Sequence, residues 1–321
     1  MDFDEINQLT TGGKIPSGAS YTSPIERPTP IQTTKVEQSS PQPSFNPLHK
    51  HFRKPGVSIS LPSKYYWYKG SVELSATGEV DIYPMTASDE IMLKNPDALM
   101  NGRALENLLT SCVPQIKNVR SIVSPDLDAL FVAIRLASAG DQMDLDVTCP
   151  KCQYQQTMAV SLHTILDNIT TMSPPYHVTL DTNLVAFLKP FSFEDQIKAT
   201  TVAFNETRSI MLIEKAEKEG NEEARRTLSE RALKNMTELK FDIIVSNIEQ
   251  IDADGQAVTD KQFIKEFLQN ADKKYVNLID KAMEKINNVG IPKEYPMICS
   301  KEDCKHEWNA GIEFNPASFF A

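Results

Sequence analysis

Four of the five cysteines stand in two tight pairs, Cys149-x2-Cys152 and Cys299-x4-Cys304. Two cysteines this close in sequence can hold one metal ion from a single turn, and four thiolates complete a tetrahedral zinc site. Each pair also lies between two segments in which apolar and polar residues alternate, as they do in a half-buried β-strand. The pattern therefore predicts a zinc ribbon, in which two β-hairpins contribute two ligands each.

The distance between the pairs sets the architecture. Paired zinc ligands are usually separated by a few tens of residues, whereas here residues 153–298 stand between Cys152 and Cys299. That region must leave the ribbon and return to it. We therefore expect an α+β fold: a zinc-ribbon-like β module with a large, mostly helical insertion, preceded by a disordered N-terminal arm.

Other readings of the cysteines stay open at this point. The pairs could be unrelated free thiols, or Cys149 and Cys152 could form a redox dithiol, although no thioredoxin-like βαβ pattern surrounds them. His306 could replace Cys304 as the fourth ligand. We favour structural zinc on Cys149, Cys152, Cys299 and Cys304, because four protein ligands close the site and exclude a catalytic metal.

Residues 1–55 differ from the rest of the chain in composition. They are rich in Pro, Ser, Thr and Gln and hold few apolar residues, so they cannot bury enough surface to offset the loss of chain entropy. We expect either a disordered tail or an extended arm that becomes ordered on a partner subunit.

The remaining chain divides by pattern into four segments. We expect a β-hairpin plus helices over 56–140, the first half of the ribbon over 141–162, a mainly helical insertion over 163–294, and the second half of the ribbon with a C-terminal tail over 295–321. In the first segment the pattern predicts strands over 57–61 and 65–68 and a hairpin over 72–82 around Gly78. Ser124 and Pro125 are expected to begin a helix as its N-cap and first residue. Helices are expected over 86–93, 99–109, 124–140, 193–248 with a break at 217–223, 260–269 and 271–288. Strands are expected over 176–180 and 184–188, and a hairpin or turn over 248–258.

Charge and hydropathy exclude several classes of protein. Lys and Arg total 33 against 43 Asp and Glu, and the net charge of −10 argues against a protein that coats nucleic acid. The N-terminus resembles neither a signal peptide nor a transit peptide, and no stretch reaches the roughly 18 apolar residues of a membrane helix. We expect the chain to be made in a reducing cytoplasm with no role at a membrane.

No motif assigns a catalytic residue. Asp252-Ala253-Asp254-Gly255 hints at a calcium loop, but its closing position is Lys261 where a Glu is required, so a tight turn is expected. Cys112 is expected to be a small buried hydrophobe. We therefore expect no enzyme, and a zinc hydrolase in particular is disfavoured by the closed site.

The order of several short sequences resembles the baseplate hub proteins of T4-like contractile-tailed phages. The stretches that carry the resemblance are Tyr83-Pro84-Met85-Thr86, Asn101-Gly102-Arg103-Ala104-Leu105, Asp126-Leu127-Asp128-Ala129-Leu130 and Asp146-Val147-Thr148-Cys149-Pro150-Lys151-Cys152. The resemblance covers about residues 57–315 and is most convincing over 80–160.

The resemblance implies a virion or assembly protein of the tail baseplate, assembled in the host cytoplasm, that works by binding other baseplate and tail proteins through its body and its arm. The baseplate would then set its oligomeric state. The rival reading is a zinc-ribbon module that binds nucleic acid, as in transcription. The absence of a basic stripe near the cysteines argues against it, because Glu302, Asp303 and Glu307 offset the nearby lysines.

Overall fold

The computed structural model describes residues 46–68, 70–312 and 319–320. The chain divides into two compact units, residues 1–50 and 51–321. Nearly all of the predicted N-terminal arm lies outside the described residues, so the expectation for it stays a prediction. The second unit holds all the strands and α-helices described here.

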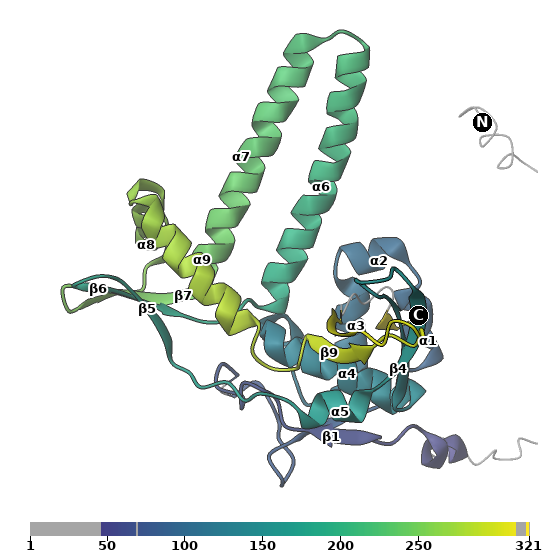
Figure 1. Ribbon diagram of the computed structural model, residues 1–321. Coiled ribbons are helices and arrows are strands. Elements are labelled where there is room, and N and C mark those ends of the chain that lie inside the picture. Colours follow the sequence, from purple (N-terminus) through teal and green to yellow (C-terminus); the bar gives the residue numbers. More distant parts are fainter. Residues whose placement is uncertain (1–45, 69, 313–318, 321) are drawn as a thin grey trace, which may run out of the picture. The chain divides into compact units, whose positions relative to one another are not determined.

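Helices and antiparallel strands alternate along the second unit (Figure 1). The helices are η1 (Pro47–His51), α1 (Ala87–Leu93), α2 (Pro96–Met100), α3 (Arg103–Cys112), η2 (Val119–Ser121), α4 (Ser124–Ala139), α5 (Leu162–Asp167), α6 (Phe193–Lys218), α7 (Glu222–Ser246), α8 (Lys261–Asn270) and α9 (Lys273–Asn287). The strands are β1 (Val57–Ile59), β2 (Val80–Ile82), β3 (Gln142–Thr148), β4 (Gln155–Ser161), β5 (Tyr176–Asp181), β6 (Leu184–Leu188), β7 (Ile248–Ala253), β8 (Gln256–Val258), β9 (Glu294–Ile298) and β10 (Glu307–Gly311).

The strands form one larger sheet and three small ones. β5, β6, β7 and β8 make a four-stranded sheet in that order, and β1–β2, β3–β4 and β9–β10 are two-stranded pairs. Every pair between these strands is antiparallel. This mixture of helices with antiparallel sheets confirms the predicted α+β class.

The first hydrophobic core surrounds helix α4. This helix is buried on nearly all sides, as its continuous apolar sequence from Ala129 to Ile134 requires. The expected stop at Gly140 is confirmed, but the expected start is off by one residue. Val123 is the N-cap and Ser124 is the first helical residue, because the Ser124 hydroxyl donates to the carbonyl of Phe191 instead of capping the helix.

The insertion contains a second core of its own. The four-stranded sheet packs its apolar face against α7, α8 and α9 through residues such as Leu188, Ile244 and Ile279. The predicted long helical region with a charged break is confirmed as α6 and α7, which lie side by side as an antiparallel hairpin (Figure 1). The strand-like segments and the turn at Asp254-Gly255 are confirmed as β5 to β8.

Two predictions for the first segment are wrong. Residues 72–82 do not form a hairpin, because Val80–Ile82 pairs with β1 while Val72 bridges to Ile116. The aromatic run at 65–68 is a series of turns instead of a strand. Strand propensity is overridden there by burial, since the Tyr68 hydroxyl accepts a hydrogen bond from the Val123 backbone N–H at 2.7 Å.

None of the helices in the described ranges is both long enough and apolar enough to cross a bilayer.

A buried carboxyl group joins the turns at 61–68 to the start of α4. Asp126 is fully buried, and its Oδ1 accepts the backbone N–H of Ser63 at 2.8 Å while its other oxygen accepts the Ser63 hydroxyl. Burial raises the pKa of Asp126 to about 6, although both Ser63 donors act to lower it.

We predict that Asp126→Asn removes a pH dependence of stability. A raised pKa means that the folded state holds this proton more tightly than the unfolded state, so its contribution is complete below about pH 4 and is lost as the pH rises through 6. The wild-type free energy of unfolding should therefore fall by up to about 3 kcal/mol relative to the variant between these pH values. Urea unfolding of both proteins from pH 4 to 7 measures this, and parallel curves would contradict it.

Candidate metal centre

Two β-hairpins that are far apart in the sequence bring the four paired cysteines together. Strands β3 and β4 end at the pair Thr148 and Gln155, and the turn between them carries Cys149 and Cys152. Strands β9 and β10 close their ladder between residues 298 and 307, and their turn carries the second pair of cysteines. The predicted ribbon topology, with one pair at each hairpin turn, is therefore present.

The two turns repeat the same local structure. The backbone N–H of Cys149 donates to the carbonyl of Tyr154 at 2.9 Å, and that of Cys299 donates to the carbonyl of His306 at 2.9 Å. One residue after the second cysteine of each pair the chain is left-handed, with φ of 57° at Gln153 and 41° at the equivalent Lys305. This positive φ reverses the chain so that both sulfurs of a turn face the other turn.

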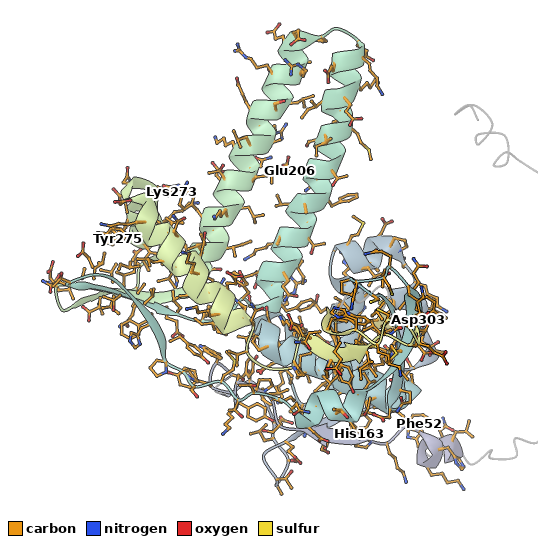
Figure 2. All side chains as sticks on the ribbon, viewed as in Figure 1. Phe52, His163, Glu206, Lys273, Tyr275 and Asp303 are labelled. Atoms are coloured by element: carbon orange, nitrogen blue, oxygen red, sulfur yellow. The ribbon has the colours of Figure 1, made fainter. Side chains whose placement is uncertain are left out.

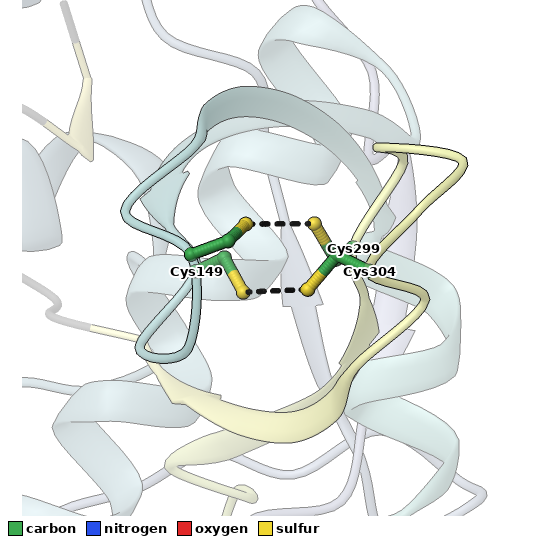
Figure 3. A group of neighbouring side chains, drawn as sticks. Cys149, Cys299 and Cys304 are labelled. Carbon is green, nitrogen blue, oxygen red and sulfur yellow. Dashed lines mark hydrogen bonds between the residues drawn. The ribbon is translucent and has the colours of Figure 1, made fainter.

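The distances between the four sulfurs fit a single tetrahedral ion. The Sγ atoms of Cys149 and Cys304 are 3.9 Å apart and those of Cys152 and Cys299 are 3.7 Å apart. Dashed lines mark these two approaches in Figure 3. All four ligand atoms lie within 4.8 Å of one another. A tetrahedron of sulfurs each about 2.3 Å from zinc has edges of about 3.8 Å, whereas a disulfide needs about 2.05 Å.

The thiols differ in how readily they ionise. Burial acts to raise the pKa of Cys149, but the backbone N–H groups of Cys152 and Lys151 donate to its sulfur and lower the pKa to about 7. Burial and the neighbouring thiols raise the pKa of Cys299 to about 12 and also raise that of Cys304. Four sulfurs this close cannot all carry a negative charge without a cation, so a bound metal would displace protons from the group.

His306, the alternative fourth ligand, is not part of the group. Its ring stacks on Trp308 with centroids 6.2 Å apart and 12° between the planes, and its backbone carbonyl closes the turn. The group of potential metal ligands found among the described residues consists of the four paired cysteines. With four sulfurs around it, an ion would have no open position for substrate or water.

Cys112 lies apart from this group and is completely buried in the first core. Burial raises the pKa of its thiol to about 11, which keeps it protonated and unreactive near neutral pH. It behaves as the small buried hydrophobe that the sequence indicated.

The sequence did not reveal that Gln156 joins the two hairpins. Its side-chain carbonyl accepts the backbone N–H of Ser300 at 2.7 Å and the Ser300 hydroxyl at 2.9 Å, and its amide donates to the carbonyl of Ile298 at 2.9 Å. The amide thus connects β4 to the backbone on both sides of Cys299. Only the alternation of β4, which puts Gln156 on the same face as Met158, could have suggested a special role.

Comparison with known proteins finds a match at the level of the family. A family model described as T4 bacteriophage base plate protein matches residues 68–321. None of the curated proteins and no solved structure matches the chain.

We predict that Gln156→Ala weakens the contact between the two hairpins. Loss of this amide leaves the backbone groups of Ile298 and Ser300 without their side-chain partner, which should lower the free energy of unfolding by about 1–2 kcal/mol. Gln155→Ala is the matched control, because Gln155 is exposed on the same strand; it should change stability by less than about 0.5 kcal/mol. Equal effects of the two substitutions in chemical denaturation would refute the role of Gln156.

Proposed function

Because the chain belongs to the T4 bacteriophage base plate protein family, we propose that it is a non-enzymatic structural or assembly protein of the hub region of a contractile phage tail baseplate. The observation that carries this proposal is the extent of the match, residues 68–321. The matched region includes both cysteine turns and the whole insertion between them. The match therefore covers the whole region that the two cysteine turns enclose.

The proposed action is binding to other baseplate subunits. The four-cysteine group has no open coordination position, and the sequence assigns no catalytic residue, so neither supports an enzyme. Contacts would be made by the body and by the Pro-rich arm, which has the composition of a segment that orders on a partner. The protein would act in the virion tail after assembly in the host cytoplasm.

Zinc is the metal that we propose for Cys149, Cys152, Cys299 and Cys304. Four thiolates in a tetrahedral arrangement are typical of structural zinc, and the sulfur distances of 3.7 and 3.9 Å fit its bond lengths. Soft sulfur ligands also disfavour magnesium and calcium. The ion would join two hairpins that come from opposite ends of the insertion.

The charges around the cysteine turns do not favour the rival, nucleic-acid-binding function. Lys151, Lys301 and Lys305 are exposed there, but so are the acidic residues between and beside them, Glu302, Asp303 and Glu307. A protein that binds the phosphate backbone of a nucleic acid needs a surface that is mainly positively charged. A protein surface with alternating charges is better suited to another protein.

We predict that the purified protein contains one zinc per chain and that Cys149→Ser lowers this content and the free energy of unfolding by at least about 3 kcal/mol. The control is Cys112→Ser, which alters a buried thiol outside the cluster and should leave one zinc bound. Elemental analysis and denaturation give both readouts. Metal-free wild-type protein from a preparation without chelators would refute the zinc site.

We predict that a phage lacking this chain makes heads but no complete baseplates. Electron microscopy of the infected cells tests this, and the wild-type gene supplied in trans should restore complete tails.

The chain should also show no salt-dependent affinity for duplex DNA at micromolar concentration. Complete tails without the chain, or tight salt-dependent DNA binding, would contradict the proposed function.

A further inference from the structure

The helical hairpin of α6 and α7 has an apolar groove at its base, where the two helices meet α9. The pocket in this groove has a volume of about 330 Å³. Its lining is formed by Phe191, Ala199, Val202, Ala203, Glu206, Met236, Leu239, Lys240, Ile243, Ile244 and Asp280. Apart from three charged residues, every side chain in this lining is apolar.

Glu206 is the unusual member of this lining. Its side chain lies between α6 and α7 (Figure 2) and only 6% of the residue is exposed. Across the described part of the chain, no hydrogen bond or ion pair engages its carboxyl group. Lys240 is the cation of the lining, but its Nζ already contacts Asp280 Oδ2 at 2.9 Å. A carboxylate that lines an apolar groove and has no cation of its own would pair with a cation that entered the groove.

Exposed apolar side chains continue this groove along the hairpin. Ile210 lies one turn beyond Glu206 on α6, and Leu233 lies one turn beyond Met236 on α7. Their exposed fractions are 53% for Ile210, 69% for Leu233 and 55% for Met236. Three large apolar residues exposed on one hairpin next to an apolar pocket indicate a surface that another molecule covers.

We propose that this groove binds an apolar segment of another baseplate polypeptide and that a lysine or arginine side chain of that segment enters the pocket and pairs with Glu206. The proposal rests on the proposed function for the nature of the partner. The apolar lining would take the aliphatic stem of the basic side chain, and the carboxylate would take its charged end. Charge also argues against a second copy of this chain, because a symmetric contact through this groove would place one Glu206 toward the other.

The chemistry of the pocket can be tested with n-pentylammonium, which has the stem and the charge of a lysine side chain. The full-length protein with ¹³C-labelled methionine methyl groups reports binding through the resonance of Met236. We expect saturable binding of n-pentylammonium that is at least about tenfold tighter than that of neutral 1-pentanol. In Glu206→Gln this preference should fall to about one.

Two variants keep the test specific. Glu214→Gln removes an exposed carboxylate from the same helix and should keep the tenfold preference. Ala203→Leu fills the groove from an exposed lining position and should abolish the binding of both probes. Equal affinity of the two probes for the wild-type protein would overturn the proposal, and so would a preference that survives Glu206→Gln.

The identity of the occupant is tested with a photocrosslinking amino acid at Leu233 in infected cells, followed by sequencing of the crosslinked peptide. A peptide from a different polypeptide, with a lysine or arginine among apolar residues, is the expected result. A crosslink to a second copy, to residues 1–45 of the same chain or to nothing would overturn the proposal. The probe experiment uses isolated protein, so a failure there is distinct from a failure of the baseplate function, which would appear as complete tails without the chain.

Discussion

The fold depends on the meeting of four sulfurs from two hairpins that are separated by residues 153–298. Each hairpin has only two strands, and such a unit is marginal by itself in water. A metal that bound all four sulfurs would close this long loop in the folded state. By analogy with a disulfide, a covalent link of that span removes unfolded-chain entropy worth on the order of 5 kcal/mol. Gln156 adds a direct link between the hairpins beside the sulfurs.

The insertion is structurally separate from the two cysteine hairpins that enclose it in the sequence. Because the insertion has its own core of sheet and helices, it does not need the ribbon to bury its apolar residues. Its base is instead joined to the first core by specific contacts, such as the Phe191 carbonyl that accepts the backbone N–H of Ser124 at 2.7 Å and the Gln196 amide that donates to the Ser124 hydroxyl at 2.8 Å. The hairpin of α6 and α7 extends from a base that is fixed at several points.

The sequence was most informative where a local pattern matched a local physical requirement. The cysteine pairs predicted the ribbon, and the charged break at 217–223 predicted the end of one long helix and the start of the next, which the structure confirms as α6 and α7. The wrong predictions concern contacts between segments that are distant in sequence. Nothing local to residues 72–82 shows that Val80–Ile82 pairs with β1 while Val72 bridges to Ile116. Gln156 and Glu206 were missed for the same reason, since their roles depend on neighbours that only the folded chain supplies.

The cysteine group and Glu206 differ in where the cation that would balance their negative charge comes from. In the cysteine group the excess negative charge of four thiolates would be balanced by a metal that the chain itself encloses, so that site would be complete within one protein. At Glu206 the carboxyl group is buried by the chain, yet the cation of the lining is held by Asp280. A carboxylate in the groove lining beside exposed apolar side chains would favour a partner that brings a cation on an apolar segment, which would make this hairpin the part of the molecule that selects a partner.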